Sequence, residues 1–256
     1  MNSQPAIQAI YRYPVKGLSP QALRQTRLTP GGTLPADRLY AIENGPTGFD
    51  PAAPAYFPKQ RFLMLMKNER LAALRTDFDE ATHTLTIESD GREVVHADLC
   101  TPEGRLAVET FFRRYMAKEL RGPPKVLFGA RHSFSDVAKK VVSIVNLGSV
   151  AALETSIGAT VNPLRFRANL YVHGWPAWRE FGLLNREISI GKNVRLKVIK
   201  RIVRCAATNV DPDTGLRDLE IPGTLMRSFG NMDCGVYAEV TTGGEIGIGD
   251  ALSEPL

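Results

Sequence analysis

The segment Lys200–Gly215, KRIVRCAATNVDPDTG, joins a run of alternating polar and apolar residues to a single cysteine and then to a loop rich in turn formers. Alternation over the first residues predicts a half-buried β-strand. The Asp, Pro and Gly residues that follow predict a turn that ends it. Cys205 therefore stands at the end of a strand beside a polar loop. A ligand or substrate can reach a thiol in such a position.

Two interpretations of Cys205 remain open at this stage. A lone free cysteine is often a small buried core residue. Alternatively, Arg201 and Arg204 lie close in sequence and supply positive potential that favours the thiolate, which is the form that binds metal or attacks an electrophile.

The chain around this segment is rich in short strand-like runs separated by Gly, Pro and Asp. We expect strands at 7–13, 22–29, 39–43, 85–89, 141–145, 165–173, 187–190, 194–203, 235–240 and 246–252. Helical spacing of apolar residues predicts one amphipathic helix over 103–120 and a shorter one that begins at Asn146 or Ser149 and ends near Gly158. The predicted fold class is mainly β with a few helices (α+β).

Gly122-Pro123-Pro124 ends the longer predicted helix and is our candidate domain boundary, which divides the chain into 1–122 and 125–256.

Composition excludes several classes of protein. The 256 residues are 43% hydrophobic and 23% charged, as in ordinary globular proteins, and a net charge of +5 falls short of the basic tract of a nucleic-acid binder. The start MNSQP is not a signal peptide and no apolar run is long enough for a membrane span, so we expect a cytoplasmic protein that binds neither nucleic acid nor membrane. Three cysteines without a CxxC pair argue against a disulfide framework or a zinc ribbon.

Basic residues recur in three other segments. Arg165, Arg167 and Asn169 alternate with apolar residues, which predicts that they share one face of a strand. That face is either ordinarily solvated or binds a phosphate and a polar heterocycle, since guanidinium groups bind phosphate oxygens bidentately. Taken singly, Lys16 in YPVKG is by default a solvated surface charge, and Arg38 in ADRLYAI is by default half of an Asp–Arg surface pair.

Six short motifs follow one another along the chain: YPVKG, ADRLYAI, RFRAN, RCAATNVDPDTG, CGVYAEV and IGIGD. In this order they resemble MOSC proteins that have an N-terminal β-barrel domain. Within that family the chain is similar to the mitochondrial amidoxime-reducing components and their bacterial counterparts. The resemblance extends over residues 7–252. It implies an N-terminal β-barrel-like domain at 1–122 and a MOSC β-barrel domain at 125–256.

The resemblance also implies a molybdenum–molybdopterin cofactor. In that family the molybdenum takes one protein thiolate, and the match gives this metal-ligand role to Cys205. The implied cofactor contacts are Lys16, Arg38, Asn146, Ser149, Arg167, Asn169 and Thr208. Cys205 is then the catalytic ligand, and Asp211 is a candidate proton donor.

The implied activity is that of an oxidoreductase that reduces N-hydroxylated compounds such as hydroxylamines, amidoximes and N-hydroxylated bases. The sequence has no nucleotide-phosphate loop and no cysteine cluster for an iron–sulfur centre, and the ferredoxin domain of some bacterial relatives does not follow Leu256. We therefore expect electrons from an external partner, which is a flavoprotein reductase, a cytochrome or a ferredoxin.

The chain departs from the family pattern at two positions near these residues. Gly17 replaces a serine that is common after the lysine, and Ala168 replaces a proline that is usual between the arginine and the asparagine. Two other functions stay open: a sulfur carrier with a persulfide on Cys205, and a non-catalytic module that binds a phosphorylated ligand. We expect Cys100 and Cys234 to be buried structural thiols.

Overall fold

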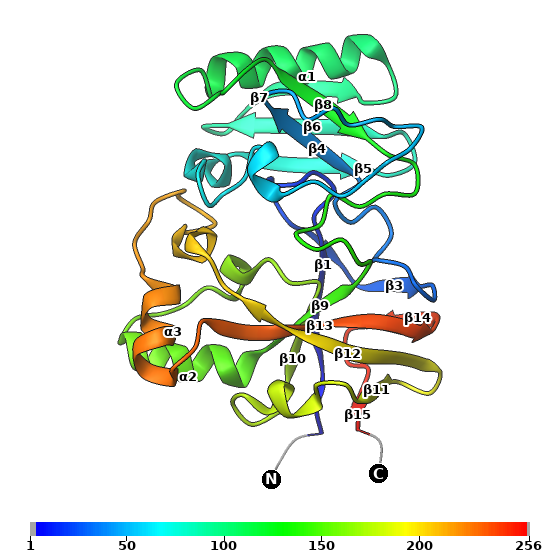
Figure 1. Ribbon diagram of the computed structural model, residues 1–256, viewed down its shortest axis with the longest axis vertical. Helices are drawn as coiled ribbons and strands as arrows, with labels where there is room; N and C mark the ends of the chain where they lie inside the picture. The colour runs from blue at the N-terminus through cyan, green and yellow to red at the C-terminus, as the bar shows by residue number, and fades with distance from the viewer. Residues whose placement is uncertain (1–3, 255–256) are drawn as a thin grey trace.

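The computed structural model describes residues 4–254, in which strands predominate and the helices are few, so the predicted fold class is confirmed. Two lobes are stacked along the long axis of the molecule (Figure 1). The lower lobe contains residues 6–28 and 142–253, and the upper lobe contains residues 40–128. Among residues 4–254, none of the helices is both long and apolar enough to cross a membrane.

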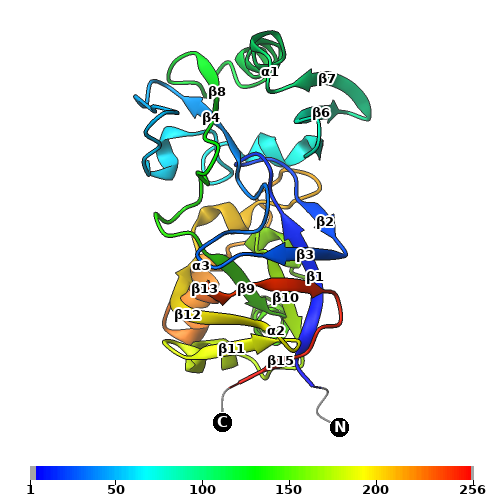
Figure 2. The same cartoon turned by 90° about the vertical axis from the view of Figure 1, so that its right-hand side faces the viewer.

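The lower lobe is built on one curled sheet (Figure 2). The strands of this lobe are β1 (Ala6–Arg12), β2 (Gln21–Leu23), β3 (Gln25–Leu28), β9 (Val142–Asn146), β10 (Leu170–His173), β11 (Glu187–Ile190), β12 (Val194–Val203), β13 (Asp233–Thr242), β14 (Gly244–Gly247) and β15 (Leu252–Ser253). Eight of them form the sheet in the order β15-β11-β12-β13-β9-β10-β1-β2. Alternation along β12 buries Val194, Leu196 and Val198 in the core beneath the sheet.

Helices α2 (Leu147–Ile157) and α3 (Ile221–Phe229) lie together at one side of the lower lobe (Figure 1). Asn146 caps α2 through a hydrogen bond that its side chain accepts from the amide of Gly148, and Gly158 ends the helix at a φ of 74°. This helix is therefore confirmed.

The upper lobe contains a three-stranded antiparallel sheet of β5 (Arg75–Asp79), β6 (Thr84–Ser89) and β7 (Arg92–Asp98), and a pair formed by β4 (Tyr40–Asn44) and β8 (Pro124–Phe128). Helix α1 (Pro102–Tyr115) covers them (Figure 1). The predicted helix over 103–120 is too long. Beyond Tyr115 the chain forms turns in which the amide of Glu119 donates to Met116, and these turns keep Met116 buried without extending the helix.

The chain begins in the lower lobe, crosses into the upper lobe and then returns. Strand β1 pairs with β10 and β3 pairs with β14, so segments from both ends of the sequence lie side by side in the lower lobe. The predicted strand over 22–29 is split, because β2 pairs with β1 whereas β3 pairs with β14. The domain division at 1–122 and 125–256 stays a prediction.

The predicted strand over 165–173 was wrong in its first half. A 3-10 turn, η3 (Pro163–Phe166), precedes β10, and Asn162 caps it by accepting a hydrogen bond from the amide of Leu164. Pro163 starts the turn, and Arg167 ends it in the left-handed region with a φ of 50°. Arg165, Arg167 and Asn169 therefore do not share a strand face.

Candidate functional site

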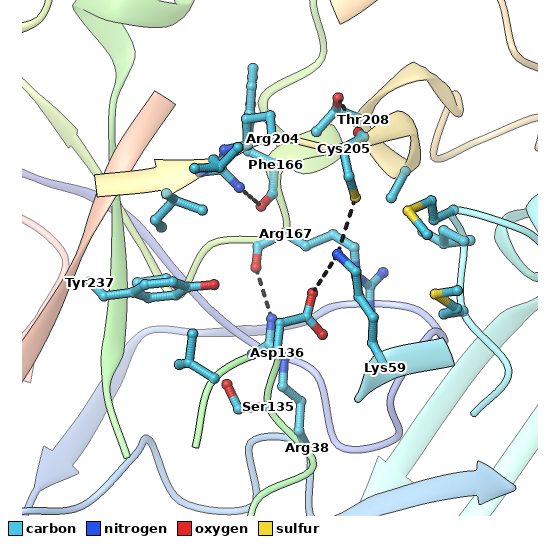
Figure 3. A pocket seen from close by; sticks show the side chains of 18 of the residues that line it. Arg38, Lys59, Ser135, Asp136, Phe166, Arg167, Arg204, Cys205, Thr208 and Tyr237 are labelled. Atoms are coloured by element: carbon cyan, nitrogen blue, oxygen red, sulfur yellow. Dashed lines mark hydrogen bonds and ion pairs between the residues drawn. The ribbon is translucent and has the colours of Figure 1, made fainter. Parts of the chain in front are cut away.

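A cavity of about 260 Å³ lies where the two lobes meet (Figure 3). The upper lobe contributes Lys59 and the segment 64–66 to its wall. The lower lobe contributes the end of β12 and the turn before β10, and the connecting segments add Arg38 and Asp136. Six residues that the sequence nominated line this cavity: Lys16, Arg38, Arg167, Asn169, Cys205 and Thr208.

Cys205 follows β12 directly and precedes the 3-10 turn η5 (Ala206–Asn209). The hydroxyl of Thr208 donates to the carbonyl oxygen of Cys205 at 2.9 Å, which fixes the turn. The thiol is half-buried and points into the cavity, where the ammonium of Lys59 donates to Sγ at 3.3 Å (Figure 3). Cys205 is therefore an accessible thiol and not a buried core residue.

The other two cysteines lie outside this cavity. Cys234 is fully buried, and burial raises the pKa of its thiol to about 12. Cys100 is exposed, so the expectation of two buried thiols is confirmed for Cys234 and wrong for Cys100.

A chain of charged groups runs across the cavity floor. The ammonium of Lys16 donates to Phe134 O at 2.8 Å and to Asp136 Oδ1 at 2.5 Å, and Lys59 donates to Asp136 Oδ2 at 3.4 Å. Loss of hydration by itself raises the pKa of the Asp136 carboxyl, but Lys16 and Lys59 outweigh it and hold this pKa well below its usual range. Asp136 is therefore a carboxylate at neutral pH and a poor proton donor.

The pKa values of the two lysines shift in opposite directions. Burial lowers the pKa of Lys16 more than Asp136 raises it. For Lys59, burial also lowers the pKa, but Asp136 and Cys205 together outweigh it and raise the pKa above its usual value. Lys59 is only 25% exposed at its side chain, so its charge acts mainly on the cavity.

Arg167 is a half-buried cation without a carboxylate partner among residues 4–254. Its Nη2 donates to Leu18 O at 2.8 Å, and its guanidinium lies 4.2 Å from the ring centre of Tyr13. Burial lowers the pKa of Arg167, because the charged guanidinium has lost hydration without gaining a carboxylate partner. An anion bound beside it would remove that cost.

Arg38 lies over the same tyrosine ring. It forms an ion pair with buried Asp37, and its guanidinium lies 4.8 Å from the ring centre of Tyr13. The guanidinium of Arg204 donates to the backbone carbonyl oxygens of Phe166 and Cys234, at 2.9 Å and 2.7 Å. Arg204 thus braces the wall, whereas Arg38 and Arg167 face the cavity.

The two departures from the family pattern have local causes. Gly17 has a φ of +86°, and a Cβ there would lie 3.0 Å from Leu63 O, so a serine would be strained at this turn. The amide of Ala168 donates to the hydroxyl of Tyr171 at 3.1 Å, a bond that proline could not form.

Asn146 and Ser149 lie outside the cavity. Both are fully buried, and they donate to the carboxylate of Glu180 at 2.9 Å and 2.8 Å. Asn169 lines the cavity, but its amide oxygen accepts from the hydroxyl of Ser143 at 2.8 Å. These side chains support the sheet and the start of α2.

Asp211 is also outside the cavity. One oxygen accepts from the backbone amides of Asp213 and Thr214, and the other accepts from Arg165 at 2.9 Å. Loss of hydration raises the pKa of this carboxyl, but those hydrogen bonds outweigh it and lower the pKa. Asp211 therefore stabilises the conformation of its loop.

Three further polar residues that line the cavity were not predicted from the sequence: Lys59, Asp136 and Tyr237. Lys59 lies in the short 3-10 turn η1 (Lys59–Arg61), and Asp136 lies in an irregular segment. The Tyr237 side chain extends from β13 and its hydroxyl points into the cavity (Figure 3), where it has no hydrogen-bond partner within residues 4–254. No local pattern marks the two charged residues, whereas the alternation along β13 does indicate which face Tyr237 occupies.

Two protein-family models match the chain. A model described as "MOSC domain" matches residues 124–253, and one described as "MOSC N-terminal beta barrel domain" matches residues 4–118. Mitochondrial amidoxime reducing component 2 of Bos taurus is 33% identical over 123 residues, which cover 43% of this chain and only 36% of that protein.

Two solved structures are also similar. The YUAD protein from Bacillus subtilis is 13% identical, with a TM-score of 0.45 over 97% of this chain and 94% of that one. YiiM from Geobacillus stearothermophilus is 19% identical, with a TM-score of 0.35 over 45% of this chain and 54% of that one. On the evidence of the two domain matches, the chain belongs to the MOSC family and begins with a MOSC N-terminal β-barrel domain.

Proposed function

We propose that this protein is a molybdenum-cofactor-binding oxidoreductase that reduces N-hydroxylated compounds with electrons from an external redox protein. Membership of the MOSC family and the partial match to an amidoxime reducing component support this function. The observation on which it chiefly depends is that the thiol of Cys205 and the cations Lys16, Arg38 and Arg167 line one cavity between the lobes.

The residues of this cavity fit a molybdenum–molybdopterin group. A thiolate is a soft, polarisable ligand, and Cys205 offers one such donor with its sulfur directed into open space. Arg167 lacks a carboxylate partner within residues 4–254, and guanidinium groups bind phosphate oxygens bidentately. Lys16, Arg38 and Arg167 would therefore hold the phosphate and pterin portions, and Cys205 would hold the metal.

Reduction of an N-hydroxylated compound consumes two electrons and two protons: R–NH–OH becomes R–NH₂ and water as the N–O bond breaks. When bound, the cofactor supplies the two-electron redox chemistry. The protein must bind and orient the substrate beside it and provide a hydrogen-bond donor to the departing oxygen.

Tyr237 is positioned for that donation. Burial raises the pKa of its hydroxyl, which therefore keeps its proton at neutral pH, and the hydroxyl points into the cavity (Figure 3). Asp136 is unsuited to the task, because its pKa is held below the usual range. Water must supply the two protons that the reaction consumes, and the cavity is open enough to admit it, since Asp136 keeps 44% of its side chain exposed.

Metal and sulfur analysis of the purified protein tests this function. Molybdenum in a one-to-one ratio, together with reduction of a hydroxylamine or amidoxime by a chemically reduced viologen, is the expected result. Labile sulfur on Cys205 without metal would instead identify a sulfur carrier. Neither metal nor labile sulfur, with tight binding of a phosphorylated ligand, would identify a non-catalytic module.

A further inference from the structure

The ammonium of Lys59 is the only cation shown to contact the sulfur of Cys205 within residues 4–254, and it comes from the opposite lobe. Nζ lies 3.3 Å from Sγ and 3.4 Å from Asp136 Oδ2, and both contacts are visible in Figure 3. The two residues are 146 positions apart in sequence. None of the roles assigned above accounts for this contact.

The position of Lys59 does not depend on the thiol. Its backbone belongs to η1, where the amide of Arg61 donates to Pro58 O at 3.0 Å and that of Phe62 donates to Lys59 O at 3.1 Å. At the other end of the side chain, Asp136 holds the ammonium and is itself held by Lys16 at 2.5 Å. Lys59 is thus a donor fixed at both ends before any ligand reaches Cys205.

We propose that Lys59 is a positioning residue for the Cys205 sulfur, donating to it across the lobe junction so that the orientation and the electron density of the metal-binding thiolate are both set by the upper lobe. The inference rests on the proposed function for its consequence at the metal. A thiolate has lone pairs enough to accept this hydrogen bond and still bind a metal, and hydrogen bonds to ligand sulfur tune the reduction potential of the centre.

The direction of that tuning follows from charge. Reduction adds negative charge at the metal and its ligands, and a fixed cation beside the sulfur stabilises the reduced state more than the oxidised state. Lys59 should therefore raise the reduction potential and make the centre easier for an external donor to reduce. If Lys59 only formed an ion pair with Asp136, as surface residues do, its loss would leave the reactivity of the sulfur and the reduction potential unchanged.

Two variants separate these cases. Lys59→Met removes the charge and the donor but keeps much of the side-chain volume, and Lys59→Arg keeps both charge and N–H donors. Lys125→Met is the matched control, because Lys125 is an exposed lysine of β8 that does not line the cavity beside Cys205. All are made with Cys100→Ser, because Cys100 is exposed and would react, whereas Cys234 is buried.

The first measurement uses cofactor-free protein and the alkylation of Cys205 by uncharged iodoacetamide at one neutral pH. We expect Lys59→Met to slow the reaction about five- to tenfold and Lys59→Arg by less than about twofold, because a donor held 3.3 Å from Sγ keeps the sulfur directed into the cavity through which the reagent enters. Lys125→Met should react at the parent rate. An unchanged rate in Lys59→Met, or equal slowing in Lys59→Arg and Lys59→Met, overturns the proposed contact.

The second measurement uses metal-loaded protein, in which the reduction potential and the Mo(V) electron paramagnetic resonance signal are recorded. We expect a lower potential and a shifted signal in Lys59→Met, with parent values restored in Lys59→Arg. A parent potential and signal in Lys59→Met refute the role at the metal. If the parent protein itself contains no molybdenum, the proposed function fails, and the alkylation rates still decide whether Lys59 positions the sulfur. Should Lys59→Met not fold, Lys59→Gln takes its place in both measurements.

Discussion

The guanidinium of Arg38 donates to the backbone carbonyl of Arg167 at 3.0 Å, and the two side chains lie over the same tyrosine ring, that of Tyr13. Both arginines have positive φ angles, 54° and 50°. Each such residue costs on the order of 1–3 kcal/mol, which the surrounding structure must offset. Residues 129 positions apart are thereby held together as a pair of cations at the cavity wall.

Replacing Arg167 tests this pair. We expect Arg167→Glu to give folded protein that lacks the cofactor, because the substitution reverses the charge that would meet the phosphate. Arg167→Lys should weaken retention by about tenfold, since an ammonium cannot form the bidentate contact. Molybdenum content after gel filtration measures both. Full cofactor in Arg167→Glu would show that the pair is merely solvated.

Replacing Cys205 tests the metal ligand. Serine nearly fills the volume of cysteine but is a poor ligand for a soft metal, so Cys205→Ser should keep its melting temperature and lose turnover and most of its molybdenum. Cys100→Ser is the control, because Cys100 is exposed and does not line the cavity. Wild-type activity in Cys205→Ser would contradict the assignment.

Replacing Tyr237 tests the hydrogen-bond donor. Tyr237→Phe keeps the ring and removes only the hydroxyl that points into the cavity. We expect kcat to fall about three- to tenfold at constant molybdenum content, as for the loss of one neutral hydrogen bond in the transition state. Steady-state kinetics with a reduced viologen measures the effect. An unchanged kcat would mean that water, and not Tyr237, donates to the departing oxygen.

The stability of the lower lobe should depend on Glu180. Burial raises the pKa of this carboxyl above its ordinary value of 4.5, although hydrogen bonds from Asn146 and Ser149 oppose the shift. A raised folded-state pKa contributes stability that is complete below about pH 4.5 and is lost as pH rises through the folded-state pKa.

Glu180→Gln removes this titration and keeps an oxygen that accepts from Asn146 and Ser149. The free energy of unfolding of the parent, relative to Glu180→Gln, should therefore decrease between about pH 4.5 and neutrality, as urea titrations at several pH values can measure. Glu220→Gln serves as control, since that side chain is 66% exposed. A difference that rises with pH would refute the assignment.

The electron supply can be tested with purified components. The sequence has no nucleotide-phosphate loop, so we expect turnover with a reduced viologen and none with NAD(P)H alone. Addition of a flavoprotein reductase, with or without a cytochrome or ferredoxin, should restore NAD(P)H-dependent turnover. Steady NAD(P)H oxidation by the protein alone, coupled to product, would reveal an internal redox site.

Several features of the molecule followed from local sequence patterns. Alternation predicted β11 and β12 at their observed bounds, and the Asn146 cap with Gly158 at the end predicted α2. Cys205 was identified at the end of a strand because a strand followed by turn formers is a local signal. These patterns concern neighbours in sequence, whose conformations depend on short-range sterics and hydrogen bonds.

At 165–173 alternation predicted a strand, but Asn162 and Pro163 begin a 3-10 turn there. Asn146 and Ser149 show a different limit. Both were nominated as cofactor contacts, and their polar atoms instead bind Glu180, which lies more than 30 positions away.

By itself, the sequence determined the mainly β fold class, the family and the thiol at the end of β12. Tertiary structure alone decided that Lys59 and Asp136 lie beside Cys205, and that Arg38 and Arg167 meet at Tyr13. The reason is physical: secondary structure depends on periodicities within a few residues, whereas these contacts join the two lobes, and their geometry exists only after the β1–β10 and β3–β14 pairs have brought distant segments together.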